Sequence, residues 1–260
     1  MSLLFNLTGK VALITGSSKG IGRAIAMRMA EHGAKVVISS RKAEACEAVA
    51  KEIREAGGEA MVKTCHIGRK EELQALVDAT IEKWGRIDIL VCNAGVNPFF
   101  GTSAEMSDEV YDRIMNNNVK SNWWLCKMVL PQMAERHDGA VVVVSSVAGV
   151  QGTDRLGVYS LSKAADMQLV RNIAVEWGPH NIRANCIAPG VIRTDFSRAL
   201  WENPNSAAYQ ASVGGPLGRV GEPDEVAGAA LFFASRAGNF TTGQTMVMDG
   251  GRTTGSVTQG

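Results

Sequence analysis

Short apolar runs alternate along this chain with segments in which apolar residues recur every three or four positions. Continuous apolar runs predict strands that are covered on both faces, and strands that alternate with helices predict right-handed crossovers. The chain is therefore predicted to form an α/β Rossmann fold, with a doubly wound parallel sheet of about seven strands flanked by helices. The expected strands are Val11–Ile14, Val36–Ile38, Ile87–Cys92, Ala140–Val144, Ile182–Ile187 and Thr245–Met248.

Two apolar stripes with helical spacing predict helices that pack on this sheet. The second stripe is followed by Gly178 and Pro179, which are typical of a helix end. With 260 residues, 45% apolar composition and no internal repeat, residues 1–260 are expected to form one domain. The first of the two apolar stripes consists of Ile21, Ile25 and Met29, and the second consists of Leu161, Ala165, Leu169, Ile173 and Trp177.

The charge balance argues against several classes of function. The formal charge is +1, from 27 basic and 26 acidic residues, so neither nucleic acid nor an anionic membrane surface is an expected partner. We find no apolar stretch long enough for a membrane span and no signal-peptide pattern. The five scattered cysteines lack a CxxC pair and are expected to be reduced, packed thiols, and the four isolated histidines favour no metal site. A cytoplasmic protein that acts on a small molecule is the expectation.

A glycine-rich turn, TGSSKGIG at Thr15 to Gly22, follows the first predicted strand and precedes the first predicted helix. Backbone amides at such a helix N-terminus face an anionic pyrophosphate well, and glycine allows the close approach. The spacing is GxxxGxG, and on its own such a turn can be only a structural bend. The expected cofactor contacts here are Gly16, Ser18, Lys19, Gly20, Ile21 and Gly22.

The end of the second strand favours a phosphorylated cofactor. At this position a carboxylate binds the ribose hydroxyls of NAD, whereas an arginine accommodates a 2′-phosphate. This chain has Ser40 and Arg41, and Lys19 can approach the same phosphate. NADP(H) is therefore the expected cofactor. In the alternative interpretation, Arg41 and Lys42 only begin a solvent-exposed helix.

Tyr159 and Lys163 stand four residues apart in YSLSK, and Ser146 lies thirteen residues upstream. A tyrosine hydroxyl, with a pKa of about 10, is a poor base near neutral pH, and a positive charge on the same helical face favours the phenolate. Ser146 would hydrogen-bond the substrate oxygen, with Ser145 as the competing candidate. The alternative is a tyrosine packed under a solvated lysine on an amphipathic helix.

The segment from Val191 to Glu222 departs from the alternation of strands and helices. It is rich in glycine and proline, and we expect a mobile, partly helical substrate lid, since long segments of this kind are often functional. The alternative is an ordinary connecting loop. Five apolar residues could line a substrate pocket or pack on one another: Phe99, Phe100, Phe196, Leu200 and Trp201.

Taken in order, these motifs resemble the short-chain dehydrogenase/reductase family over nearly the whole chain. The resemblance also includes NAG at Asn93, the single residue Asn118 and PGxxxT at Pro189. More narrowly, SSRK at Ser39, CHIG at Cys65, NPFFG at Asn97 and FSRALW at Phe196 look like the NADP-dependent carbonyl and retinal reductases of the peroxisomal branch. The C-terminal address of those relatives is missing from the sequence, so the resemblance does not carry their location.

The resemblance implies hydride transfer between nicotinamide C4 and a carbonyl or alcohol, with NADP(H) as cofactor. It implies that Tyr159 exchanges the proton, that Lys163 also holds the nicotinamide ribose, and that Asn118 holds a water linking Lys163 to solvent. Asn116 and Asn117 are expected on the helix surface. Where the family often carries an acidic residue near adenine, this chain has His66. The further cofactor contacts implied are His66, Ile67, Asn93, Ala94, Gly95, Pro189, Gly190, Ile192 and Thr194.

The same residues also bear on alternative functions. Enoyl reductases of the family usually space tyrosine and lysine more widely, which disfavours enoyl reduction. A catalytically idle NADP-binding regulatory protein is disfavoured because all four catalytic positions are intact, and an NAD-preferring alcohol dehydrogenase remains an alternative. The resemblance further implies a homotetramer, formed through the helix after Ser107 and the helix that contains Tyr159.

Overall fold

A seven-stranded parallel sheet forms the centre of the computed structural model, which describes residues 3–255. The strand order is β3-β2-β1-β4-β5-β6-β7, and every neighbouring pair is parallel. This confirms the predicted Rossmann fold. The strands are β1 (Val11–Thr15), β2 (Lys35–Ser39), β3 (Glu59–Val62), β4 (Ile89–Cys92), β5 (Gly139–Val144), β6 (Ile182–Pro189) and β7 (Thr245–Met248).

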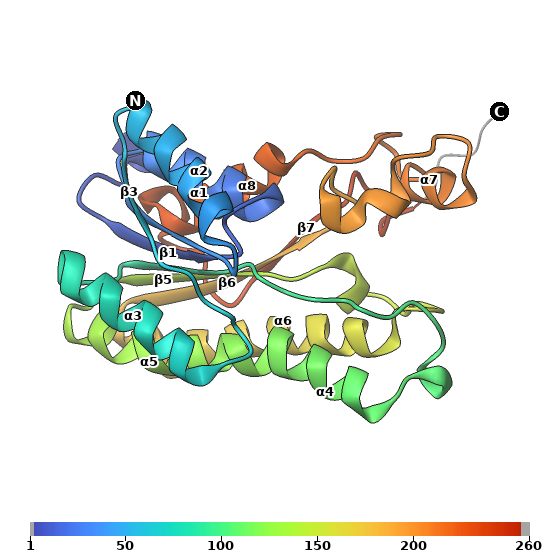
Figure 1. The fold of residues 1–260 in the computed structure, drawn as a ribbon, viewed down its shortest axis with the longest axis horizontal. Coiled ribbons are helices and arrows are strands. Elements are labelled where there is room, and N and C mark those ends of the chain that lie inside the picture. The colour runs from blue at the N-terminus through green and yellow to red at the C-terminus, as the bar shows by residue number, and fades with distance from the viewer. Residues whose placement is uncertain (1–2, 256–260) are drawn as a thin grey trace.

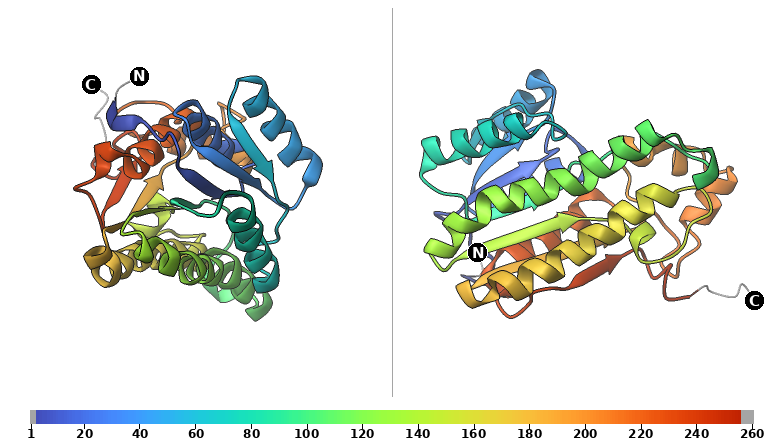
Figure 2. Two further views of the ribbon diagram at one scale, coloured as in Figure 1. Left: turned by 90° about the vertical axis from the view of Figure 1, so that its left-hand side faces the viewer. Right: turned by 90° about the horizontal axis from the view of Figure 1, so that it is seen from below.

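Helices cover both faces of the sheet, as Figures 1 and 2 show. The first face carries α1 (Gly20–Glu31), α2 (Ala43–Glu55) and α8 (Pro223–Ala234), which share one apolar core with the sheet. The second face carries α3 (Lys70–Trp84), α5 (Ser121–Glu135) and α6 (Gly157–Trp177), which share the other core. Two more helices lie toward the end of the molecule where the strands finish: α4 (Asp108–Met115) and α7 (Ala207–Ser212).

Burial of the strands explains which of them the sequence revealed. Every residue of β1, β4 and β5 is buried, so these strands read as continuous apolar runs. The sequence did not indicate β3, because this edge strand has only four residues, begins with Glu59 and is only half-buried. Edge strands lack a neighbour on one side and therefore need fewer apolar residues.

The apolar stripe predicted for α6 is partly wrong. Leu161 is 60% exposed, whereas Val158, Val170 and Ile173 are buried. The helix turns the polar side chains of Lys163 and Asp166 toward the sheet, so that spacing of apolar residues alone does not reveal the buried face. The stripe predicted for α1 is confirmed, and α6 ends at Trp177, before Gly178, as expected.

The cysteines and the helices also bear on the expected class of protein. All five cysteines are free and buried, as the sequence predicted. Within residues 3–255, none of the helices combines the length and the apolar character that crossing a membrane requires. The same residues contain no cluster of three or more His, Cys, Asp or Glu side chains suited to a metal ion.

Candidate active site

The predicted motifs converge at the carboxyl ends of the strands. β1 lies between β2 and β4, so the chain order reverses between β1 and β4, and in open α/β sheets ligands bind at such a point. The glycine turn follows β1 and Asn93 follows β4, while Ser146 comes after β5 and Pro189 ends β6. Four segments that are far apart in the sequence therefore meet at one edge of the sheet.

The glycine turn is fixed to its neighbouring strand by hydrogen bonds. Gly16 and Gly20 have φ values of 67° and 56°, in the left-handed region that favours glycine. The Ser17 amide donates to the Ser39 carbonyl at 3.1 Å, and the Ser39 amide donates to Ser17 Oγ at 2.8 Å. The turn is thus held in one conformation by the end of β2.

Thr15 and the NAG segment clasp the same turn from the other side. The amides of Asn93 and Ala94 both donate to Thr15 Oγ1 at 3.1 Å. Asn93 Nδ2 donates to the carbonyl oxygens of Thr15, at 2.9 Å, and Gly16, at 3.2 Å. The side chain of Asn93, predicted to contact the cofactor, is therefore occupied in joining β1 to β4.

The start of α1 fits the pyrophosphate of a dinucleotide. The amides of Gly20, Ile21 and Gly22 donate to no group within residues 3–255, and the next amide, that of Arg23, donates to the Lys19 carbonyl at 3.3 Å. Unpaired amides at a helix N-terminus form an anion-binding site. A side chain at Gly22 would overlap the Gly16 carbonyl oxygen, so glycine is required for this turn. Ser18 and Lys19 lie in the same turn.

The end of β2 presents a free guanidinium. Arg41 is exposed and has no hydrogen bond or ion pair with another residue in the described range 3–255. Ser40 Oγ lies 3.1 Å from Cys46 Sγ, and its carbonyl accepts from the Cys65 amide at 3.0 Å. Lys19 Nζ lies 3.3 Å from Asp195 Oδ2, so this cation already has a partner on the neighbouring segment.

His66 and Ile67 lie in the loop after β3, and His66 is engaged within that loop. The His66 amide donates to Glu72 Oε2 at 2.7 Å, and its Nδ1 accepts from the Gly68 amide at 3.1 Å. The hydrogen bond from the His66 amide, followed by that from Arg69, lowers the pKa of Glu72. Ile67 packs against the core of the second face. A contact of these two residues with adenine stays a prediction.

The ammonium group of Lys163 is buried beside Tyr159. Lys163 is 4% exposed, and its Nζ donates to the Val144 carbonyl at 3.0 Å and to Asp166 Oδ2 at 3.1 Å. The same Nζ lies 5.8 Å from the centroid of the Tyr159 ring. Burial acts to lower the pKa of Lys163, but Asp166 and Tyr159 outweigh it, and the pKa is raised. The ammonium is thus charged at neutral pH.

The hydrogen bonds of the two serines distinguish them. Ser145 is buried, and its hydroxyl donates to the Lys163 carbonyl at 2.7 Å, so it is committed to holding α6. Ser146 is half-buried, and its Oγ accepts from the Ala148 amide at 3.1 Å. The Ser146 hydroxyl proton has no acceptor within residues 3–255, which leaves it available to a substrate oxygen.

Asn118 lies in a π-turn, Asn116–Lys120, between α4 and α5, and is fully buried. Its Oδ1 accepts from the Val96 amide at 2.8 Å, and its Nδ2 donates to the Val96 carbonyl and to Ser162 Oγ, both at 3.0 Å. A Cβ on Gly95 would lie 3.4 Å from Asn118 Oδ1 and 3.7 Å from Lys163 Nζ. The structure therefore brings the NAG segment to Asn118 and Lys163.

The expectation that Asn117 lies on the helix surface is wrong. Asn117 is 8% exposed, and its Nδ2 donates to the Arg113 carbonyl at 2.7 Å. A π-turn adds a residue to the helical turn, so that two successive side chains face inward. Asn116 is half-buried.

The PGxxxT segment has divided roles. The Gly190 amide donates to the Met248 carbonyl at 2.9 Å, which joins the end of β6, at Pro189, to β7. Ile192 is 5% exposed and belongs to the core of the first face. Thr194 lies against the glycine turn, 3.1 Å from where a Cβ on Gly20 would stand. Of these predicted cofactor contacts, Thr194 is the one whose side chain meets the turn.

The segment 191–222 contains α7 and a 3-10 helix, Asp195–Leu200. Phe196 is 61% exposed, and its ring centroid lies 6.4 Å from that of Tyr159. Trp201 Nε1 donates to the Thr194 carbonyl at 3.0 Å, and the Arg193 guanidinium lies 5.1 Å from its ring. Of the five apolar residues expected near a substrate, Phe196 is the one that forms a ring contact with Tyr159.

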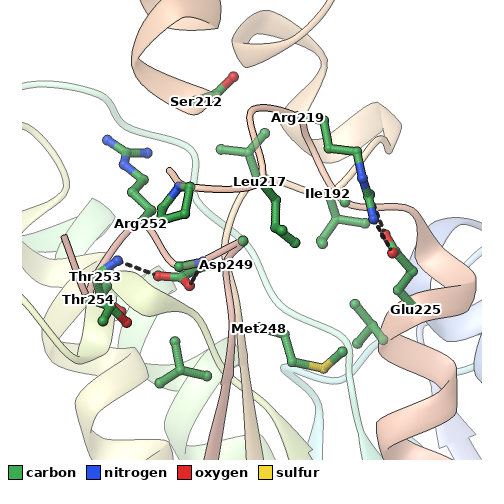
Figure 3. A pocket seen from close by; sticks show the side chains of 17 residues that line it. Ile192, Ser212, Leu217, Arg219, Glu225, Met248, Asp249, Arg252, Thr253 and Thr254 are labelled. Carbon is green, nitrogen blue, oxygen red and sulfur yellow. Dashed lines mark hydrogen bonds and ion pairs between the residues drawn. The ribbon is translucent and has the colours of Figure 1, made fainter. Parts of the chain in front are cut away.

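A cavity of about 690 Å³ lies between the two ends of this segment, the start of α8, the end of β7 and the residues after β7. Figure 3 shows Ile192, Leu217 and Met248 in its wall, with Arg219 paired to Glu225 at one side. None of the four predicted catalytic residues lines it. This cavity is therefore separate from the group around Lys163.

Comparisons with known proteins agree with this geometry. A family model described as enoyl-(acyl carrier protein) reductase matches residues 16–253. Dehydrogenase/reductase SDR family member 4 of Bos taurus is 42% identical over 247 residues, covering 94% of this chain and 88% of the relative. The chain belongs to the short-chain dehydrogenase/reductase family. It is an NAD(P)-dependent oxidoreductase that acts on CH–OH and C=O groups.

Other members of the short-chain dehydrogenase/reductase family also match over nearly the whole of this chain. The mitochondrial SDR family member 2 of Homo sapiens is 39% identical, covering 94% of this chain and 86% of the relative. A 7α-hydroxysteroid dehydrogenase solved with NADH and 7-oxo glycochenodeoxycholic acid is 36% identical, with a TM-score of 0.91, and the match covers 100% and 98% of the two chains. A gluconate 5-dehydrogenase of Burkholderia cenocepacia solved with NADP and tartrate is 32% identical, with a TM-score of 0.91 and coverage of 97% and 98%.

Sequence reasoning missed two residues of this short-chain dehydrogenase/reductase site. Thr15 ends β1 and holds the NAG segment, and Asp166 pairs with Lys163 inside the protein. A signal for Asp166 was present, since an acid three residues after a lysine lies on the same face of a helix. The signal was overlooked because such pairs usually lie in solvent.

Gly22→Ala is predicted to damage the glycine turn. The new Cβ would overlap the Gly16 carbonyl oxygen and lie 2.5 Å from Asn93 Nδ2, so the turn must move and cofactor binding should weaken. We expect a loss of about 1 to 3 kcal/mol in the free energy of unfolding, measured by denaturant titration, and weaker binding of the cofactor by fluorescence titration. Gly228→Ala is the matched control, because Gly228 is also helical and has nothing within 4 Å of its Cβ position. Equal effects of the two substitutions would contradict the prediction.

Proposed function

We propose that this short-chain dehydrogenase/reductase is an NADPH-dependent carbonyl reductase, which reduces a ketone or aldehyde and also catalyses the reverse oxidation. The observation that carries the proposal is the buried, charged Lys163 with its Nζ 5.8 Å from the Tyr159 ring centroid. A buried ammonium beside a phenol is the arrangement that makes the phenolic proton transferable. The unpaired amides at the start of α1 support a dinucleotide at the same edge of the sheet.

In this proposal the bound cofactor supplies the hydride that reduces the carbonyl carbon. Tyr159 donates its hydroxyl proton to the carbonyl oxygen, and the charge of Lys163 favours the phenolate that remains. Ser146 donates a hydrogen bond to the same oxygen and stabilises the charge that develops there. In the oxidation of an alcohol the Tyr159 phenolate accepts the hydroxyl proton. Asn118 joins the segment after β4, at Val96, to Ser162 of α6, which carries Tyr159 and Lys163.

The preference for NADP(H) is supported by two cations and by the absence of an acid. Arg41 is exposed and unpaired within residues 3–255, and Ser40 stands where a carboxylate would repel a 2′-phosphate. Lys19 lies in the adjoining glycine turn. The gluconate 5-dehydrogenase was solved with NADP and the 7α-hydroxysteroid dehydrogenase with NADH, so the preference depends on the residues of each chain.

We further propose that residues 191–222 form a lid over the substrate. Phe196, on the 3-10 helix of this segment, places an exposed aromatic ring beside Tyr159, and such a ring favours an apolar group next to the reacting carbonyl. Thr194 rests on the glycine turn, and Lys19 pairs with Asp195. Contacts of this kind would let the cofactor influence the position of the lid.

Enoyl reduction and an idle cofactor-binding role are the two alternatives to this function. Enoyl reduction is favoured by the description of the matching family model, but the four-residue spacing of Tyr159 and Lys163 is narrower than enoyl reductases of the family usually have. An idle cofactor-binding protein would need none of the four catalytic positions that this chain retains. Consumption of NADPH with a panel of ketones, aldehydes and enoyl thioesters separates all three.

A cytoplasmic location stays a prediction, with which five free cysteines are compatible.

Tyr159→Phe is predicted to abolish turnover while NADPH still binds. The ring is kept and the transferable proton is lost, and general acid–base catalysis contributes about 10²- to 10⁴-fold to a rate. We therefore expect kcat to fall by at least about 100-fold, with the dissociation constant of NADPH unchanged in a fluorescence titration. Tyr111→Phe removes the same hydroxyl from a partly exposed residue of α4 and should retain full activity. Activity of the Tyr159 variant at the wild-type level would refute the mechanism.

Arg41→Asp is predicted to reverse the cofactor preference. The substitution removes a cation that would bind the 2′-phosphate and adds a carboxylate that would bind ribose hydroxyls. A hydrogen bond to a charged group contributes about 1.5 to 3 kcal/mol, so the NADPH to NADH ratio of kcat/KM should fall about 10- to 100-fold. Arg236→Asp makes the same charge change in the segment before β7, away from the glycine turn, and should leave the ratio unaltered. An unchanged ratio in the Arg41 variant would show that NADP(H) preference does not depend on this residue.

A homotetramer is proposed from the family resemblance, through α4, which follows Ser107, and α6, which contains Tyr159. Exposed apolar side chains on these helices support it, since large apolar surfaces usually lie in interfaces. Light scattering should give four times the 27.7 kDa mass of the chain, and Trp123→Glu should reduce it. A monomeric mass at all concentrations would overturn the proposal. The exposed apolar side chains that support the interface are Tyr111 on α4, Leu161 and Val175 on α6, and Trp123 on the adjoining α5.

A further inference from the structure

A buried carboxylate lies directly beneath the catalytic lysine. Asp166 is fully buried, and its Oδ2 lies 3.1 Å from Lys163 Nζ. The two residues are three positions apart on α6, so both side chains leave the same face of the helix. Besides Asp166, the Lys163 ammonium donates to the Val144 carbonyl. The position of the Lys163 ammonium is therefore set by the Val144 carbonyl and by one acidic side chain, Asp166.

Asp166 also connects Lys163 to the π-turn that carries Asn118. Asp166 Oδ1 accepts from Asn122 Nδ2 at 2.9 Å, and the same Asn122 Nδ2 donates to the Asn118 carbonyl at 2.7 Å. All four residues of this row are buried: Lys163, Asp166, Asn122 and Asn118. The row joins two of the predicted catalytic positions inside the protein, without passing through solvent.

The two cysteine thiols that face this pair have raised pKa values and are neutral near pH 7. Tyr159 faces Lys163 from α6, Cys92 faces the pair from β4 and Cys186 faces it from β6. Burial raises the pKa of Cys186 to about 12, and a hydrogen bond that the Cys92 thiol donates to Cys126 of α5, together with burial, raises the pKa of Cys92. Lys163 and Asp166 thus supply the charges that act on the Tyr159 phenol.

These two charges act on the phenol in opposite directions. The ammonium of Lys163 favours the phenolate, whereas the carboxylate of Asp166 disfavours it and offsets part of that effect. Burial raises the pKa of Asp166, while Lys163 and Asn122 act against the rise. In a low-dielectric interior an opposite charge at 3.1 Å holds the Lys163 ammonium in place.

We propose that Asp166 is a positioning residue for proton transfer: it anchors Lys163 and, through its negative charge, sets the pH range in which Tyr159 exchanges its proton. The proposal rests on the mechanism proposed above, in which Tyr159 is the proton donor and acceptor. It adds a residue that touches neither substrate nor cofactor. Its effect reaches the reaction through Lys163.

The test is the substitution Asp166→Asn, which removes the negative charge and keeps the size of the side chain. Two readouts are measured: the ultraviolet absorbance of the Tyr159 phenolate in the cofactor-free protein, and kcat/KM for NADPH-dependent reduction as a function of pH. The absorbance of Tyr159 is isolated by subtracting a matched protein that also carries Tyr159→Phe. Glu176→Gln is the control, because Glu176 is an exposed acid on the same helix.

Removing the charge of Asp166 should shift both midpoints to lower pH, since this carboxylate lies 3.1 Å from the ammonium that faces the phenol, and a negative charge disfavours a phenolate. The sign follows because loss of a negative charge makes the phenolate easier to form. Glu176→Gln should leave both curves in place. If Asp166→Asn lowers the rate or the stability without moving either midpoint, or moves them to higher pH, Asp166 has only a structural role and the proposal fails.

Two further measurements keep the outcome decisive. If Asp166→Asn does not fold, Asp166→Leu removes the same charge with an apolar side chain that branches at the same carbon, and the same readouts are taken. The activity of Tyr159→Phe separates this proposal from the one on which it rests. Full activity of that variant overturns the mechanism itself. An inactive Tyr159 variant together with an unmoved pH profile in the Asp166 variant overturns only the role given to Asp166.

Discussion

Burial of the central strands on both faces is the constraint on which the rest of this structure depends. A strand that is covered above and below can satisfy its backbone only through its two neighbours in the sheet. Parallel neighbours need crossover connections, which place helices on the two faces and bring all carboxyl ends to one edge. The motifs after β1, β4, β5 and β6 therefore meet there, although more than 170 residues separate Gly16 from Pro189.

Contacts between these converging loops give the site its rigidity. Thr15 Oγ1 accepts two amides of the NAG segment, and Asn118 holds the chain after β4 against Ser162 of α6. Lys163 is then placed by the Val144 carbonyl at the end of β5 and by Asp166. Burying a charged pair gains little stability, because the loss of hydration offsets the attraction. The pair is better explained by what it does to the site than by its contribution to folding.

The sequence predicted those parts of the structure that depend on local pattern. Central strands, the glycine turn and the order of the motifs follow from short-range spacing, and the structure confirms the Rossmann fold that they imply. β3 was missed because a half-exposed edge strand carries little apolar signal. The buried face of α6 was misassigned because Lys163 and Asp166 occupy it, and a pattern of apolar residues cannot show that polar groups point inward.

Asn117 and the choice between the two serines depended on contacts made in three dimensions. The π-turn that buries Asn117 is not visible in the local sequence, since asparagines are common on helix surfaces. Ser145 and Ser146 are adjacent and chemically identical, and the structure distinguishes them by burial and by the hydrogen bond of Ser145 to the Lys163 carbonyl. That bond joins residues eighteen positions apart.

Lys19 shows how the proposed cofactor site and the proposed lid share one cation. Its partner Asp195 also pairs with Arg198, and hydrogen bonds from Arg198 and then from Lys19 lower the pKa of Asp195. Asp195 therefore remains paired when Lys19 turns toward another anion. Because both Lys19 and Asp195 are more than half exposed, their ion pair contributes little stability, whereas a phosphate offers a stronger charge-assisted contact. The pair therefore presents little barrier to a 2′-phosphate, and exchange of partners would remove one of the two contacts between the proposed lid and the glycine turn, leaving that of Thr194.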